Sequence, residues 1–268
     1  MKTRIISAAI ALAIFIPLIV VGGIYFAVAA SILSILAYKE IIDLKKSHKK
    51  IPKVVSILGL VSLLLVVLGN YENPSNIYFI DRALLFIPII ALLLPVVFYK
   101  SENYSTKDAF YMIASVLLIG CFFNSLIALR NLPGENTGLF LFIYLFSITL
   151  LTDTFAYFVG ILIGKHKMAP TVSPKKSWEG FFAGLIGGST CALIVYSNLL
   201  GSLSFKIILM TILLSVIGQL GDLVFSKIKR ENDIKDFSNI MPGHGGVLDR
   251  LDSIIMVVIS YIIIMNIF

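Results

Sequence analysis

The chain has 268 residues, of which 58% are hydrophobic and only 14% charged, and its mean hydropathy is +0.97. A soluble domain of this length needs more polar surface, so the composition excludes an ordinary globular protein and predicts an integral membrane protein. The net charge of +7 does not indicate nucleic-acid binding, because basic residues beside a membrane act first as topology signals and as contacts to anionic lipid.

Apolar stretches of the roughly 20 residues that a bilayer crossing needs recur along the chain. The first uncharged run extends from Ile5 to Tyr38, which is too long for one crossing, and Pro17 with Gly22-Gly23 divides it. No cleavage site in polar surroundings follows the first stretch, so we expect a retained helix rather than a signal peptide. The predicted spans are 5–21, 22–40, 54–70, 83–99, 109–129, 138–163, 180–200, 205–225 and 251–268.

The lysines and arginines test this nine-helix arrangement. With the N-terminus in the cytoplasm, all 22 basic residues except Arg82, Arg130 and Lys206 fall on the cytoplasmic side. Cytoplasmic segments of membrane proteins carry such an excess, and a wrong helix count would scramble it. We therefore predict an all-α, multi-pass bundle that forms one membrane domain, with hydrophobic helices over 1–130 and catalytic helices and loops over 138–268.

Three residues inside the spans are assigned structural roles. Cys121 and Cys191 lie in apolar surroundings and predict packing residues rather than a disulfide or a metal site. Asn124 falls in the middle of the fifth span, where a side-chain amide is expected to form a hydrogen bond to another helix.

The aspartates near two polar cytoplasmic loops, 164–180 and 226–250, predict a metal site. Asp222 lies about one turn before the eighth span ends, whereas Asp249 and Asp252 open the ninth span on one helix face. Antiparallel neighbours would bring the three carboxylates to one depth, where their charges repel unless a cation compensates them. Oxygen ligands favour Mg²⁺, Mn²⁺ or Ca²⁺. The alternative is simple pairing of these aspartates with nearby arginines or lysines.

Glycines and basic residues in the same loops are typical of phosphate binding. Gly243, Gly245 and Gly246 surround His244 just before a helix start, where backbone N–H groups and the helix dipole favour an anion. A tight turn that re-enters the bilayer would explain the glycines equally well. Together with the lysines of both loops, the pattern predicts a polyphosphate site. Its position at the bilayer surface implies that one substrate is a lipid headgroup.

The stretch from Ser226 to Asp252, with its Lys229-Arg230, Pro242-x-His244-Gly245-Gly246 and Asp249-Arg250-Leu251-Asp252 elements, resembles the signature of phosphatidate cytidylyltransferases, also called CDP-diacylglycerol synthases. Met241 departs mildly from the leucine, isoleucine or phenylalanine usual in that family. The resemblance extends through the SPKKSWEG segment, Asp153-Thr154-x-Ala156-Tyr157 and Gly221-Asp222-Leu223, whereas the N-terminal spans match only in being hydrophobic and similar in number.

The resemblance implies a fold, a reaction and partners. The family condenses CTP with phosphatidic acid to CDP-diacylglycerol and pyrophosphate, using Mg²⁺ or another divalent metal, with room for a second cation. It implies a multi-pass protein of the cell (inner) membrane, bound to membrane lipid and not to nucleic acid, and it suggests a homodimer.

The resemblance also implies roles for single residues. Asp222, Asp249 and Asp252 hold the metal, and His244 orients or donates to a phosphate oxygen. Arg250 contacts substrate or pairs with an aspartate, whereas Asp153 orients the site or supports the second cation. Lys175, Lys176, Lys229 and Arg230 neutralise the triphosphate or the phosphatidate headgroup, the last two as catalytic residues. The other predicted substrate-binding residues are Ser173, which alternatively caps the next helix, Lys235, Asp236, Gly243, Gly245 and Gly246.

Two other functions fit parts of the sequence. A CTP-dependent enzyme acting on a different lipid would keep the same site, because acyl-chain contacts are generic apolar residues. A transporter would need discontinuous helices in two related halves, whereas this chain has no internal repeat and concentrates its unusual charges in the C-terminal half.

Overall fold

The structure is a computed structural model that describes residues 2–48, 51–69, 71, 82–240, 243 and 245–267. The chain folds into two compact units. Unit 1 consists of Met1–Pro133 and Asp236–Asp249, and unit 2 consists of Gly134–Lys235 and Arg250–Phe268. The single membrane domain, with its division into 1–130 and 138–268, remains a prediction.

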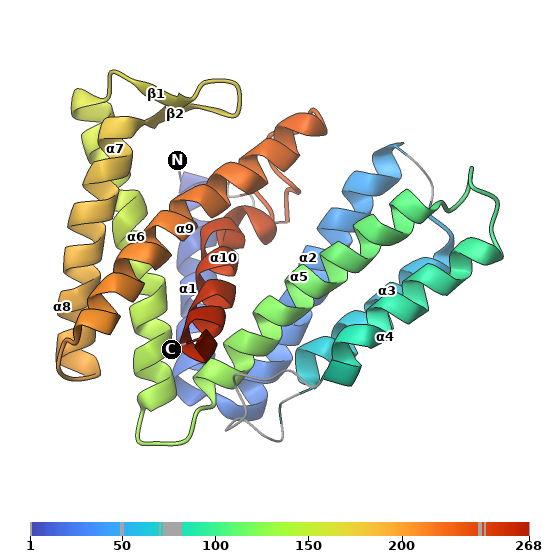
Figure 1. The fold of residues 1–268 in the computed structure, drawn as a ribbon, viewed down its shortest axis with the longest axis horizontal. Helices are drawn as coiled ribbons and strands as arrows, with labels where there is room; N and C mark the ends of the chain where they lie inside the picture. The colour runs from blue at the N-terminus through green and yellow to red at the C-terminus, as the bar shows by residue number, and fades with distance from the viewer. Residues whose placement is uncertain are drawn as a thin grey trace. The chain divides into compact units, whose positions relative to one another are not determined.

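The helices agree with the predicted spans (Figure 1). Unit 1 contains α1 (Lys2–Val21), α2 (Gly23–His48), α3 (Lys53–Leu68), α4 (Arg82–Leu93), the 3₁₀ helix η2 (Leu94–Val97) and α5 (Thr106–Arg130). Unit 2 contains α6 (Thr137–Ile163), β1 (Lys167–Ala169), β2 (Ser173–Ser177), α7 (Trp178–Ala183), the π-helical η3 (Gly184–Gly188), α8 (Ser189–Leu199) and α9 (Phe205–Glu231). The last helix, α10 (Leu248–Ile267), begins in unit 1 and continues in unit 2.

The length and composition of these helices support a multi-pass membrane protein. Within the described part of the chain, five helical segments are long and apolar enough to cross a membrane. Ala9–Val21, Lys53–Leu68 and Ala83–Val97 are apolar but shorter. The nine crossings and the cytoplasmic N-terminus remain predictions.

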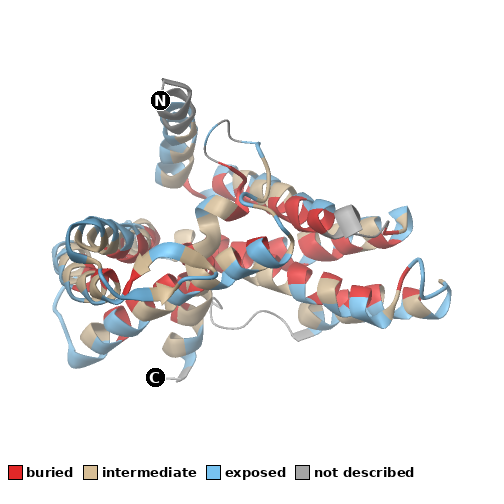
Figure 2. Cartoon of the chain, turned by 90° about the horizontal axis from the view of Figure 1, so that it is seen from above, coloured by how far each residue is buried: buried red, intermediate tan, exposed pale blue. Residues whose placement is uncertain are grey.

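The long N-terminal apolar run breaks where its glycines predict. Gly22 and Gly23 have φ of +69° and +57°, a left-handed conformation that glycine adopts without strain. Arg130 and Asn131, at the end of α5, satisfy backbone groups around this break. The Arg130 guanidinium donates to the Ile19 and Val20 carbonyls, and the Gly23 N–H donates to the Asn131 side chain over 2.9 Å. Figure 2 shows α1, marked N, with mostly exposed and intermediate residues.

The core of unit 1 forms around α5, which packs against α2, α3 and α4 and is buried along most of its length. Asn124 confirms its predicted role, because its amide nitrogen donates to the carbonyls of Val66 and Val67 over 2.9 and 3.2 Å. Those carbonyls lie in the last turn of α3, where intrahelical donors run out. Asn124 of α5 therefore links the two helices by donating hydrogen bonds to carbonyls at the end of α3.

Unit 2 is built around close packing of α6 against the continuous helical segment α7–η3–α8 (Figure 1). Gly180, Gly184 and Gly188 recur every fourth residue and face α6. A Cβ atom at Gly188 would lie 2.5 Å from the Thr152 Cα, and one at Gly184 would lie 2.7 Å from the Thr152 carbonyl oxygen. Small residues at this spacing allow helix backbones to approach closely in a membrane.

The polar loop 164–180 contains the one departure from the predicted all-α fold in the described residues. Its residues form a two-stranded antiparallel hairpin in which Lys167 pairs with Ser177. Glu179 closes the base of the hairpin, because its carboxylate lies 2.6 Å from the His166 Nδ1 and accepts the His166 N–H at 3.2 Å. The ladder satisfies backbone groups that the predicted irregular loop would leave to water. The hairpin therefore gives the lysines of β2 a fixed position.

Candidate active site

Unit 2 contains a cavity of about 690 Å³ lined by the hairpin, α6, α7 and α9. Its lining combines charged side chains with apolar ones. Lysines of the hairpin face it together with aspartates of α6 and α9, and aromatic and aliphatic residues complete the wall. The main contributors are Asp153, Tyr157, Ile161, Lys167, Lys175, Lys176, Phe181 and Asp222. The cavity can therefore contact both charged and apolar groups of a ligand.

An ion pair joins the hairpin to α9 inside this cavity. The Lys176 Nζ lies 2.7 Å from the Asp222 Oδ2 and also donates to the Gln219 carbonyl over 3.1 Å. The Ser226 hydroxyl donates to the other Asp222 oxygen over 3.2 Å. Both charged side chains are about a quarter exposed, at 26% and 27%. The pair is held by several contacts but stays within reach of a ligand.

Helical spacing on α9 places the polar groups of this wall. Gln219, Asp222 and Ser226 follow at intervals of three and four residues, so they share one face of the helix. The Gln219 side chain is buried and donates to the Phe181 carbonyl over 3.4 Å. On the hairpin side, the Ser177 hydroxyl accepts the Gly180 N–H over 3.2 Å and starts α7. Strand and helix meet there, which fixes the end of β2 beside α9.

Three carboxylates of unit 2 interact through their charges. Asp153 of α6, Asp222 of α9 and Asp252 of α10 repel one another, whereas Lys176 attracts Asp153 and Lys229 attracts Asp252. Gly221 of α9 lies against α10, where an added Cβ atom would lie 2.8 Å from the Met256 Cγ and 3.3 Å from the Asp252 carbonyl oxygen. The repulsion among the three carboxylates would be relieved by an added cation.

The loop before α10, in unit 1, is organised by Asp249 and by Glu40 of α2. The Asp249 Oδ2 accepts the N–H groups of Phe237 and Gly246 over 2.8 and 2.9 Å. Glu40 accepts the next two N–H groups, those of Val247 and Leu248. These amide hydrogens are therefore already engaged, and the phosphate contact predicted for Gly246 would require them to be released.

Comparison of the sequence with known proteins shows its family. A sequence model of the cytidylyltransferase family matches residues 2–268. The chain is 38% identical over 264 residues to the phosphatidate cytidylyltransferase of Staphylococcus haemolyticus (strain JCSC1435). It is 37% identical over 265 residues to that of Staphylococcus aureus (strain COL), and both alignments cover 96% of each chain. The chain belongs to the cytidylyltransferase family.

In this cytidylyltransferase, the structure gathers part of the predicted site. Asp153, Lys175, Lys176 and Asp222 line one cavity, and Asp252 interacts electrostatically with two of them. No group of three or more histidine, cysteine, aspartate or glutamate side chains among the described residues has the geometry to hold a metal ion. The metal set of Asp222, Asp249 and Asp252 therefore remains a prediction.

The basic residues after Asp222 differ from the predicted loop because α9 continues to Glu231. Lys229 is consequently a helical residue with only 8% exposure, and its charge interacts with Asp252. Arg230 lies in the last turn and donates to the Ile234 carbonyl over 2.9 Å. Lys235 and Asp236 are exposed. The substrate contacts predicted for these residues remain predictions.

Three other predictions concern local conformation. Ser173 lies in β2, and the residue that caps α7 is Ser177, so the alternative capping role predicted for Ser173 is wrong. Gly243 and Gly245 have φ of +77° and +84°, which explains the glycines as turn residues. His244 lies outside the described residues.

Glu40, Gln219 and Lys167 are the residues that the sequence analysis missed. Glu40 and Gln219 are buried polar side chains in apolar helices, and a polar group in such a position is a functional or structural signal in itself. Lys167 lines the cavity from β1, which only the pairing of the hairpin reveals.

Proposed function

We propose that the chain is a phosphatidate cytidylyltransferase that transfers a cytidylyl group from CTP to phosphatidic acid in the membrane. The similarity to enzymes with that name over 96% of the chain carries this proposal. The charged and apolar lining of the cavity in unit 2 supports it. A CTP triphosphate and a phosphatidate headgroup are anionic, and the acyl chains of the lipid need an apolar path.

In this reaction a phosphate oxygen of phosphatidate attacks the α-phosphorus of CTP, and pyrophosphate leaves with the electrons of the broken P–O bond. The protein needs to align two anions and to offset their charge rather than to form a covalent intermediate. We propose Lys175 and Lys176 for this role, because both lie in β2 and line the cavity. Asp222 pairs with Lys176, so we expect the lysine to exchange this partner for a substrate phosphate.

The donor groups of the cavity suit a hard divalent cation such as Mg²⁺. The interacting carboxylates of unit 2 provide oxygen ligands, which Mg²⁺ prefers over nitrogen or sulfur ligands. We propose Asp222 and Asp252 as its ligands, and Asp153 as the residue that orients them or holds a second cation. Asp249 stays a ligand predicted from sequence. When bound, the metal would neutralise the phosphates of CTP.

The location of the reaction follows from the chemistry of the substrates. We propose that CTP enters from the cytoplasm, whereas phosphatidate reaches the cavity from the bilayer past its apolar wall of Tyr157, Ile161 and Phe181. This requires a multi-pass protein of the cell membrane. The predicted homodimer is retained as part of the proposal.

The test is pyrophosphate release by purified protein supplied with CTP, phosphatidic acid and Mg²⁺, with each omitted in turn. Release that depends on all three is expected. Release with another lipid acceptor but not with phosphatidate would retain the site and change the substrate. No release from folded protein under any combination would overturn the proposed function.

A further inference from the structure

Glu40 is a buried carboxylate in a helix that the sequence analysis assigned only to crossing the membrane. It lies in α2, and its side chain is 2% exposed. Its carboxylate accepts three hydrogen bonds from a segment about 200 residues further along the chain. Burying a carboxylate is unfavourable unless hydrogen bonds compensate it. The contacts of Glu40 therefore show what its negative charge stabilises.

Each oxygen of Glu40 has a defined partner. Oε1 accepts the Ser238 hydroxyl over 2.6 Å and the Val247 N–H over 2.8 Å, and Oε2 accepts the Leu248 N–H over 2.9 Å. Leu248 is the first residue of α10. The first N–H groups of a helix lack intrahelical acceptors, and the helix dipole makes a negative charge favourable there. Glu40 of α2 thus caps the N-terminus of α10.

Asp249 completes this arrangement from within the loop. Its carboxylate accepts the N–H groups of Phe237 and Gly246, directly before those that Glu40 accepts. The two carboxylates together bind both ends of the segment from Phe237 to Leu248. All of these residues belong to unit 1.

We propose that Glu40 is a positioning residue for nucleotidyl transfer. It fixes the start of α10 and the loop before it, which carry Gly243, Gly245 and Asp249, and it contacts no substrate itself. This inference rests on the proposed function, because that function gives the loop its part in the reaction. Asp252 lies one turn further along the same helix, so a shift of the α10 start would also displace this carboxylate.

The geometry distinguishes the possible substitutions at position 40. Glu40→Gln keeps the size of the side chain, but in either orientation its NH₂ group would face a backbone N–H, that of Val247 or of Leu248, in place of an acceptor. Glu40→Asp keeps the charge with a shorter reach. Since a displacement of about 1 Å can reduce a rate on the order of 100-fold, we expect Glu40→Gln to lower kcat by about that factor. Glu40→Asp should recover part of the loss.

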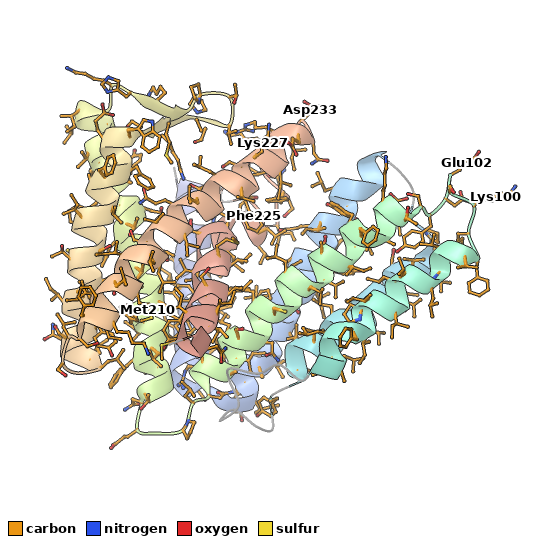
Figure 3. All side chains as sticks on the ribbon, viewed as in Figure 1. Lys100, Glu102, Met210, Phe225, Lys227 and Asp233 are labelled. Carbon is orange, nitrogen blue, oxygen red and sulfur yellow. The ribbon has the colours of Figure 1, made fainter. Side chains whose placement is uncertain are left out.

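The experiment compares pyrophosphate release by wild type, Glu40→Gln, Glu40→Asp and Ser238→Ala, with kcat and KM for CTP measured separately. Glu102→Gln is the matched control, because Glu102 is an exposed acid on the loop before α5 in the same unit (Figure 3). Hydrogen exchange at the Val247 and Leu248 amides provides a second readout. We expect Glu40→Gln to accelerate exchange there, and the control to leave both readouts unchanged.

The outcomes separate this inference from the proposed function. If wild type releases no pyrophosphate, the proposed function fails. If wild type is active and Glu40→Gln has wild-type kcat, or if its amide exchange is unchanged, the positioning role is wrong. A loss of thermal stability without a change in kcat would show a purely structural role. Should Glu40→Gln fail to fold, Glu40→Asp and Ser238→Ala test the positioning role instead. Each weakens the hydrogen bonding around position 40 and keeps a carboxylate there.

Discussion

At the scale of single residues, the candidate site contains lysines and aspartates whose opposite charges interact. Lys176 pairs with Asp222 at 2.7 Å, and Lys229 interacts with Asp252. Such pairs stabilise buried charges, and an anionic substrate can replace the carboxylate partner of the lysine. Replacing the lysines should therefore change the kinetics with CTP, whereas replacing an aspartate should change the dependence on Mg²⁺.

Replacing Lys175 and Lys176 together by alanine should raise the KM for CTP or lower kcat by about 10-fold or more. Hydrogen bonds to charged groups contribute about 1.5–3 kcal/mol each, and both side chains line the cavity. Steady-state pyrophosphate release measures the effect. Lys227→Ala is the control, because Lys227 is exposed and pairs with Glu231 at 3.4 Å (Figure 3). Unchanged kinetics of the double variant would reduce both lysines to surface charges of the hairpin.

Asp222→Ala should abolish turnover while the protein remains folded and extractable in detergent. The substitution removes the partner of Lys176 and a proposed ligand of Mg²⁺. Asp222→Asn, which can still accept the Ser226 hydroxyl, is expected to need a higher Mg²⁺ concentration for any residual activity. A titration of Mg²⁺ against activity measures this, with the exposed Asp233→Asn as control. Wild-type activity of Asp222→Ala would end the metal assignment.

At the scale of secondary structure, two elements position the site. The β-hairpin presents Lys175 and Lys176, and glycines hold α6 against α7–η3–α8. The π-helical turn η3 lies within this contact. Such turns inside α-helices frequently mark functional sites, and here the turn follows directly after α7, which lines the cavity.

Gly188→Ala should destabilise unit 2, although alanine favours helix formation more than glycine does. The added Cβ would lie 2.5 Å from the Thr152 Cα, so the two backbones must separate, at about 1–3 kcal/mol. Thermal unfolding in detergent measures the change. Ile186→Ala provides a control on the same helical segment, because Ile186 is 68% exposed. Equal melting temperatures of Gly188→Ala and wild type would contradict this packing argument.

At the scale of the whole molecule, the distribution of basic residues predicts the orientation in the membrane. In a variant without Cys121 and Cys191, single cysteines at Glu102 or Asp233 should react with a membrane-impermeant thiol reagent only from the cytoplasmic side. Cysteines at Glu135 or Ser202 should react from the outside. All four positions are exposed in the structure. Labelling of Glu102 and Glu135 positions from the same side would disprove the predicted helix count between them.

The sequence by itself determined the helices, the break at Gly22 and the family. Apolar length, glycine conformation and basic loops are properties of neighbouring residues, so they can be recognised without knowing the fold. Asp153, Lys176 and Asp222 could likewise be recognised as candidate site residues from the sequence, because ionisable residues in or beside apolar spans are unusual in any membrane fold.

Only the tertiary structure decided which of these groups meet. It paired Lys176 with Asp222, buried Lys229 because α9 extends further than its apolar pattern, and made Ser177 rather than Ser173 the cap of α7. It also brought Glu40 to the start of α10. Contacts between residues so far apart depend on how helices pack, and no local pattern of hydrophobicity or charge encodes that packing.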